Sequence, residues 1–194
     1  MSTRKDKFSL KDKRLMELAL NLASARKGLT GDNPAVGCLI VKNESEFIGQ
    51  CLESIKRVAS QIVVVDTGSD DDTIQIAESH GAQVFRFDWC DDFAAARNFG
   101  LEKATGDWLL IIDADEVLTP EGMAGLWEDI QQKNHLGFRV RCNHLERISN
   151  NKGHQQMADG WHFIPRLFRN APGIHFVGII HEQAFSSVQV RSED

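Results

Sequence analysis

The strongest structural signal in this sequence is Asp107-Trp-Leu-Leu-Ile-Ile-Asp-Ala-Asp-Glu116. Its consecutive apolar residues, Trp108 to Ile112, are too few to cross a membrane and have the length of a buried strand. Three acids, Asp113, Asp115 and Glu116, follow directly. Ligands of open α/β sheets bind at the carboxyl ends of the strands. Two carboxylates one residue apart at such an edge suit a divalent metal that itself holds phosphates.

Earlier apolar runs are also predicted to be strands, and helical patterns separate them. The runs are Ala35–Val41, Gln61–Val65 and Ala82–Phe87. The first of the intervening helices is expected to start with Ser45 as its cap, the second to end at His80, and the third to cover Asp92–Ala104. Strands that alternate with helices predict an α/β fold, in which helices cover both faces of a mainly parallel sheet.

The part of the chain after Glu116 is predicted to be richer in β-structure. Thr119-Pro120-Glu121 is typical of a helix start, and this helix is expected to end near Lys133. Polar residues from Arg147 to Gly160 indicate a mobile loop. Strands are expected at Gly137–Cys142, Trp161–Phe168 and Ile174–Ile180.

Residues 1–34 are predicted to form a helical extension ahead of a main domain at residues 35–194. Within this extension an amphipathic helix is expected at Ser9–Arg26, because Leu15, Leu18, Ala19 and Leu22 recur at helical spacing. Gly28 is expected to end this helix. We see no linker that would divide the main domain.

Composition and charge exclude several classes of protein. The 194 residues are 42% hydrophobic, which fits one domain with a substantial core. The net charge is −6 with acids and bases interspersed, unlike the basic stripe of a nucleic-acid binder. Four cysteines without a C-x-x-C pair are interpreted as core residues in a reducing compartment. With no signal peptide visible, we expect a cytoplasmic protein, and contact with the inner face of a membrane stays open.

Polar residues follow three of the predicted strands. Because the carboxyl ends of parallel strands meet at one edge, we expect a pocket with a polar rim for a nucleoside and a metal for its diphosphate. Taken alone, Asp66 is better explained as the cap of the turn that follows its strand. The residues at the three strand ends are Lys42-Asn43-Glu44, Asp66 with Ser69 and Asp70, and Asp113 with Asp115.

Several segments, in this order, resemble family 2 glycosyltransferases. They are Cys38–Glu44, Ile62–Asp70, Ala96–Trp108 and Ile112–Glu116. Two later segments, Pro165–Arg169 and Gly178–Glu182, are similar to the subgroup that includes bacterial lipopolysaccharide-core β-glucosyltransferases. The resemblance covers about Val36 to Gln183 and implies a GT-A fold and a nucleotide-sugar donor.

The resemblance implies a role for each matching residue. Asp113 and Asp115 match the Asp-x-Asp motif, in which the first acid faces the ribose or sugar and the second holds the metal. His181 matches a late histidine that completes the metal site. Oxygen ligands fit Mg²⁺ or Mn²⁺, and an imidazole favours Mn²⁺. Donor-binding roles are implied for Asn43, Glu44, Asp66, Ser69, Asp70, Arg97, Asn98 and Asp113.

An inverting transfer also needs a general base for the acceptor hydroxyl. The candidates are Glu182, Glu116 and Asp159, and we favour Glu182 because it neighbours His181 at a predicted strand end. Catalytic roles therefore fall on Glu182 and Asp113.

Plainer interpretations of some residues stay open. In one such interpretation, Arg97 pairs with Asp91 or Asp92 across a helix turn. Trp161 is either a core residue or a stacking surface for a sugar ring. Two arginines of the expected late strand either form a solvated face or meet an anionic acceptor. These are Arg166 and Arg169.

The sequence therefore predicts a metal-dependent inverting glycosyltransferase that moves a sugar from a UDP-sugar to a saccharide or glycolipid acceptor. The alternative is a non-catalytic nucleotide-sugar-binding domain, because the chain ends sooner after His181 than family members do and a truncated acceptor region is expected. A nucleotidyltransferase is less favoured, since Lys42-Asn43-Glu44-Ser45 stands where a Gly-rich, basic phosphate loop would be.

The start of the chain has a second resemblance. Leu15–Ala23 and Gly31–Asn43 resemble the opening of riboflavin-biosynthesis deaminases. Those enzymes hold zinc with His-x-Glu and Pro-Cys-x-x-Cys patterns. The Pro-Cys-x-x-Cys pattern does not occur in this sequence, and no cysteine pair follows His144-Leu145-Glu146. We therefore predict a packing role for this segment and no deaminase chemistry.

Overall fold

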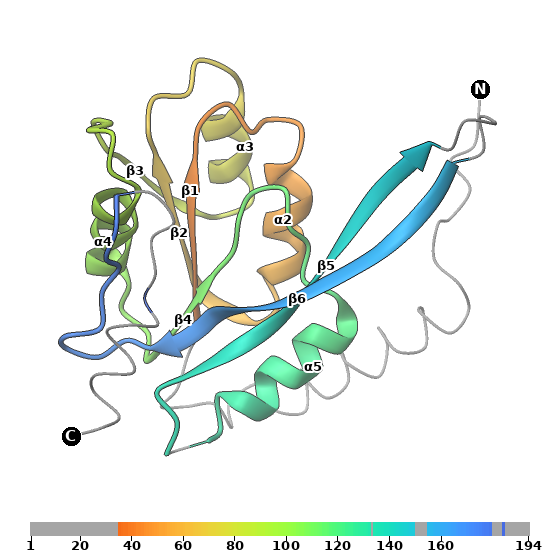
Figure 1. The fold of residues 1–194 in the computed structure, drawn as a ribbon. Helices are drawn as coiled ribbons and strands as arrows, with labels where there is room; N and C mark the ends of the chain where they lie inside the picture. The colour runs from red at the N-terminus through yellow and green to blue at the C-terminus, as the bar shows by residue number, and fades with distance from the viewer. Residues whose placement is uncertain (1–34, 133, 150–154, 180–183, 185–194) are drawn as a thin grey trace.

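The computed structural model describes residues 35–132, 134–149, 155–179 and 184, with side chains excepted at 144–149 and 155–159. Over these residues the chain forms a six-stranded sheet in the order β3-β2-β1-β4-β6-β5 (Figure 1). The predicted extension at residues 1–34, with most of its deaminase-like segment, lies outside them.

The first four strands are parallel, and the last two run antiparallel to their neighbours. The parallel strands are β1 (Ala35–Val41), β2 (Ala59–Asp66), β3 (Gln83–Arg86) and β4 (Trp108–Ile111). β6 (Gln155–Arg169) pairs antiparallel with both β4 and β5 (Gly137–Ser149). The helices are α2 (Ile48–Ile55), α3 (Thr73–Ser79), α4 (Phe93–Lys103) and α5 (Pro120–Asp129). The predicted α/β fold with a mainly parallel sheet is confirmed.

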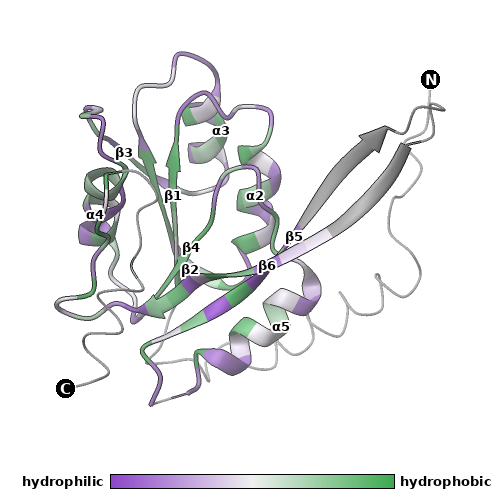
Figure 2. Cartoon of the chain, in the orientation of Figure 1, coloured by the Kyte–Doolittle hydropathy of each residue, from purple (hydrophilic) through white to green (hydrophobic). Residues whose placement is uncertain are grey.

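Two apolar layers enclose the sheet, which explains the unbroken apolar runs. One layer joins α2, α3 and α5 to Trp108 and Leu110 of β4. The other joins α4 to Leu109 and Ile111. Alternate residues of β4 thus enter opposite cores, and all four are buried. Figure 2 shows the strands of the sheet's centre as hydrophobic along their length.

Trp108 is the first residue of β4 and connects this strand to its neighbours. The side chain is fully buried, and its Nε1–H donates to the carbonyl of Ile130 at 3.1 Å. The guanidinium carbon of Arg169 lies 4.1 Å from the centre of the indole. The ring of Phe138 is 5.6 Å away. Trp108 therefore ties β4 to α5, β5 and β6.

Helix boundaries follow local capping in one case and tertiary contacts in another. At α5 the Thr119 hydroxyl accepts from the backbone N–H of Gly122 at 3.1 Å, as predicted. The prediction that Ser45 caps α2 is wrong, because the N-cap is Phe47 and has no side-chain cap. The backbone N–H of Ser45 instead donates to Asp71, which lies after β2. A contact between two loops thus replaces the expected local one.

The prediction of a loop at Arg147–Gly160 is wrong for most of these residues. Residues 147–149 continue β5, and 155–160 belong to β6. The backbone ladder pairs Ser149 with Gln155 at the end of a long hairpin that projects from the sheet (Figure 1). Backbone hydrogen bonds sustain such a ladder whatever the side-chain polarity. The segment expected to be a strand at Ile174–Ile180 is irregular over 174–179.

The cysteines divide between core and surface. Cys38 and Cys51 are buried, and burial raises the pKa of each thiol to about 12. Cys142 is partly buried and Cys90 is exposed. The interpretation as core residues is confirmed for the first two. No helix in the described part of the chain has the length and apolar character needed to span a membrane.

Candidate active site

The loops after β1 and β2 are joined through predicted donor-binding residues. The backbone N–H of Asn43 donates to Ser69 Oγ, and the N–H of Asp70 donates to Asn43 Oδ1, both at 2.9 Å. Asn43 has φ of 56°, in the left-handed region that Asn tolerates better than most residues. Asn43, Ser69 and Asp70 therefore lie together, as predicted, and form a hydrogen-bonded rim.

Asp66 is the last residue of β2, and its carboxylate accepts hydrogen bonds from the turn that follows. The residue is only 1% exposed. Its Oδ2 accepts from the N–H of Gly68 at 3.2 Å, and its Oδ1 accepts from the N–H of Ser69 at 3.1 Å. This is the capping role expected when Asp66 is considered alone. It also fixes the position of the rim residue Ser69.

Glu44 connects the rim to the acidic edge. Its backbone N–H donates to Thr73 Oγ1 at 2.7 Å, which pins the loop after β1 to the start of α3. Partial burial raises the pKa of Glu44, and the charges on Asp115, Asp71 and Asp113 raise it further. These nearby acids therefore disfavour the ionised form of Glu44.

Asp113 to Glu116 form a turn at the end of β4. The N–H of Glu116 donates to the carbonyl of Asp113 at 3.0 Å. Glu116 Oε2 accepts from the N–H of Asp113 at 2.9 Å. Ala114 is buried in the core, whereas Asp115 is exposed. The turn therefore presents one acid, Asp115, at its tip.

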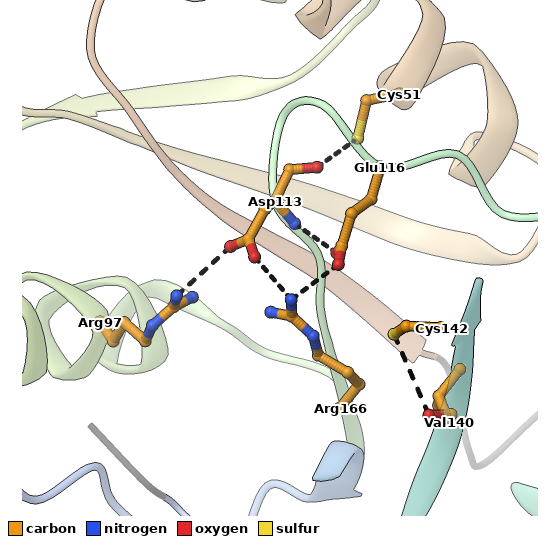
Figure 3. Close-up of polar contacts among 7 residues, drawn as sticks. All are labelled: Cys51, Arg97, Asp113, Glu116, Val140, Cys142 and Arg166. Atoms are coloured by element: carbon orange, nitrogen blue, oxygen red, sulfur yellow. Dashed lines mark hydrogen bonds and ion pairs between the residues drawn. The ribbon is translucent and has the colours of Figure 1, made fainter. Parts of the chain in front are cut away.

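Two arginines hold the first acid of the motif (Figure 3). Nη2 of Arg97 on α4 lies 3.3 Å from Asp113 Oδ1, and Nη2 of Arg166 on β6 lies 2.5 Å from Asp113 Oδ2. The same Arg166 nitrogen lies 2.8 Å from Glu116 Oε1. Burial raises the pKa of Asp113, but Arg166 and Arg97 outweigh it and hold that pKa below the usual value. The charge of Asp113 is thus compensated within the protein.

The second acid, Asp115, differs from the first. Among the residues that the structure describes, no side chain donates to the Asp115 carboxylate or forms an ion pair with it. Mg²⁺ commonly binds through one or two carboxylates together with substrate phosphates. No group of three His, Cys, Asp or Glu able to hold a metal occurs in the described part of the chain. An exposed carboxylate at a strand end is one of the ligand types that such a magnesium site uses.

Several predicted roles need correction or fall outside the described residues. Arg166 is not part of a solvated strand face, since its side chain is 11% exposed and pairs with two acids. Arg97 pairs with Asp113, and Asp92 instead caps α4 by accepting from the N–H of Ala95. His181 and Glu182 lie outside the description, as does the side chain of Asp159.

The side chain of Asn98 forms two hydrogen bonds to the backbone of Phe176, which the sequence did not indicate. Its Nδ2 donates to the carbonyl of Phe176 at 3.0 Å, and its Oδ1 accepts from the N–H of the same residue at 2.8 Å. The Arg97 guanidinium carbon lies 5.4 Å from the Phe176 ring centre. Asn98 thus fastens the segment at 174–179 to α4, beside the arginine that holds Asp113.

An exposed aromatic pair lies on β6, away from the core. Trp161 is 56% exposed and Phe163 is 53% exposed, with ring centres 5.6 Å apart. The guanidinium carbon of Arg141 on β5 lies 5.2 Å from the Trp161 ring centre, and its Nε donates to Asn143 Oδ1. The core interpretation of Trp161 is wrong. Alternation along two paired strands is the signal that would have grouped these four residues.

Known proteins resemble this chain in sequence and in fold. A TPR repeat-containing protein of Synechococcus elongatus is 40% identical over 145 residues, which are 75% of this chain and 34% of that protein. The SPbeta prophage-derived glycosyltransferase SunS of Bacillus subtilis is 32% identical over 155 residues, or 78% and 35% of the two chains. The chain therefore spans about a third of the length of these curated relatives.

The crystal structure of S. aureus TarS 1–349 has a similar fold. Its TM-score is 0.52 at 17% identity, over 79% of this chain and 53% of that one. The family model described as glycosyl transferase family 2 matches residues 38–183. That match includes the rim, the acidic turn and the arginines that hold it. The chain belongs to glycosyl transferase family 2.

Proposed function

We propose that this domain transfers a sugar with inversion from a UDP-sugar to a hydroxyl of a saccharide or glycolipid acceptor, with Mg²⁺ or Mn²⁺ bound. The observation that carries the proposal is the exposed Asp115 carboxylate, which stands at the carboxyl edge of the sheet beside the linked loops of Asn43 and Ser69. The proposed place is the cytoplasm, with a lipid-linked acceptor at the inner face of the membrane.

Each part of the edge has a distinct role in donor binding. The rim of Asn43, Ser69 and Asp70 borders the nucleoside. Asp115, with His181 as a second proposed ligand, holds the metal, and a bound metal stabilises negative charge on the departing diphosphate. Asp113 has the proposed place beside the ribose or sugar, where Arg97 and Arg166 each engage one of its oxygens and keep it ionised, so its role is electrostatic and it is not a base.

The proposed general base is Glu182. Glu116 is a weaker candidate, because Oε1 pairs with Arg166 and Oε2 accepts from the backbone N–H of Asp113. A carboxylate with both oxygens engaged is poorly placed to take a proton from an acceptor hydroxyl.

Binding of UDP and release of UDP from UDP-sugars test this function. We expect calorimetry to detect UDP binding with Mn²⁺ and a large loss of affinity after chelation with EDTA. Slow UDP release from a UDP-sugar, accelerated by a saccharide acceptor, would establish turnover. Binding without release would favour the non-catalytic domain instead. Neither binding nor release, with several UDP-sugars, would refute both.

The exposed aromatic pair supports a saccharide acceptor. The ring face of a tryptophan stacks on the apolar face of a sugar, while Arg141 and Asn143 offer hydrogen bonds beside it. We expect Trp161→Ala to raise the KM for a saccharide acceptor about 10-fold, the equivalent of one stacking contact.

Two controls separate this role from loss of fold. Hydrolysis of the UDP-sugar without acceptor should be unchanged in Trp161→Ala, since the donor edge is untouched. Trp161→Phe, which keeps an aromatic face, should retain an acceptor KM close to the wild-type value. An unchanged KM in the alanine variant would remove this surface from the acceptor site.

A further inference from the structure

A β-bulge places Arg166 at the acidic turn. Along the β5–β6 ladder Phe138 pairs with Leu167, and its neighbour Arg139 pairs with Pro165. Arg166 is therefore an extra residue without a cross-strand partner. A bulge locally interrupts the alternation of a strand and redirects the side chain at that point. The redirected side chain here is the one that contacts Asp113 and Glu116.

The ion pairs of Arg166 join it to these two acids, and the thiol of Cys142 also interacts with its guanidinium. The Arg166 side chain is 11% exposed, and a single nitrogen, Nη2, reaches one oxygen of each carboxylate. Its Nε is buried without a hydrogen-bond partner in the described part of the chain. A buried donor without a partner costs free energy, so the ion pairs and not the surroundings of Nε account for the position of this guanidinium.

Both ends of the turn are thereby tied to one point on β6. Asp113 and Glu116 are the first and last residues of the turn and also bond to each other through the Asp113 N–H and the Glu116 N–H. Asp115 lies between them, with no described partner for its carboxylate. The direction of Asp115 therefore depends on how firmly the two ends are held.

We propose that Arg166 is a positioning residue: it fixes both ends of the turn so that Asp115 meets the metal and the diphosphate. The catalytic part of this proposal rests on the proposed transferase function. A residue that holds a ligand-bearing turn affects reaction geometry, and a displacement of about 1 Å in such geometry can cost about 100-fold in rate.

The test compares Arg166→Met and Arg166→Lys with a matched control, Arg169→Met. Arg169 is on the same strand, but its guanidinium stacks on Trp108 and donates to the carbonyl of Gln132. In the metal-free protein, we expect Arg166→Met to accelerate hydrogen exchange at the Asp113 and Glu116 amides about 10-fold. Arg169→Met should leave those two amides unchanged while lowering the Tm.

The kinetic arm uses UDP with Mn²⁺ and a UDP-sugar. Arg166→Met should reduce kcat/KM for UDP release about 100-fold and weaken binding of UDP with Mn²⁺, but leave the affinity for uridine unchanged. Lysine keeps the charge but lacks the planar fork, so Arg166→Lys should recover part of the rate. Arg169→Met, assayed below its Tm, should retain the wild-type rate.

The positioning role of Arg166 and its catalytic consequence are contradicted by different results. Wild-type exchange at Asp113 and Glu116 in Arg166→Met would overturn the positioning role whatever the activity. Faster exchange with an unchanged rate would also overturn it. A wild-type protein that neither binds nor releases UDP would instead refute the proposed function, and with it the catalytic part of this role, while the exchange result still decides whether Arg166 fixes the turn.

Discussion

Asp115→Asn is expected to abolish Mn²⁺-dependent binding of UDP and to lower UDP release about 1,000-fold, the upper range for loss of one preorganised charge-stabilising group. The neutral amide keeps the shape of the side chain but removes the negative charge that a divalent cation requires. Asp115 is exposed and its carboxylate has no partner among the described residues, so the fold should be unaffected. The Tm of the variant should therefore match that of the wild type.

Asp107→Asn is the matched control for this variant. Asp107 is also exposed and also borders β4, but it precedes the strand and so lies at the opposite edge of the sheet. Calorimetry with UDP and Mn²⁺ should give wild-type binding for Asp107→Asn and no binding for Asp115→Asn. Retention of metal-dependent binding by Asp115→Asn would move the metal site away from the acidic turn.

Trp108→Ala is expected to cost about 3–5 kcal/mol in the free energy of unfolding, as for other deletions of a large buried aromatic side chain. For a chain of this length that corresponds to a fall in Tm of about 10 °C. The substitution leaves a cavity between β4 and α5, removes the donor to the Ile130 carbonyl and takes away the ring on which Arg169 stacks.

Thermal and urea unfolding of three variants would check this expectation. Trp108→Phe retains a ring but loses the hydrogen bond, so it should lose about 1–3 kcal/mol. Trp161→Ala removes an exposed indole and should change the Tm little. Similar Tm values for Trp108→Ala and Trp161→Ala would mean that burial of Trp108 does not stabilise this fold as described.

The positions of the central strands along the chain could be predicted because of the environment of each strand. β1, β2 and β4 are covered on both faces, so their residues form continuous apolar runs that stand out in the sequence. α5 was equally predictable, since Thr119 and Pro120 carry a local capping signal. The projecting hairpin was missed between Arg147 and Gly160, because backbone pairing there has no apolar pattern to reveal it.

For the candidate site, too, part could be predicted from the sequence and part could not. Residue type and position at a strand end were enough to select Asn43, Ser69, Asp113 and Asp115, because parallel strands bring their carboxyl ends to one edge. The different states of the two aspartates could not be predicted in that way. Asp113 stays ionised and is paired with Arg97 and Arg166, which are 16 and 53 residues away along the chain.

Pairing of distant charges depends on which elements become neighbours and on where a strand departs from regular alternation. The bulge at Arg166 is such a departure, and it arises from the register between β5 and β6. The sequence alone determined that a buried strand ends in acids at the carboxyl edge, because burial on both faces requires the consecutive apolar residues Trp108 to Ile112. Only the packing of α4 and β6 against that strand decided that Asp113 is held by arginines and that Asp115 remains exposed, because these contacts exist only once the chain has folded.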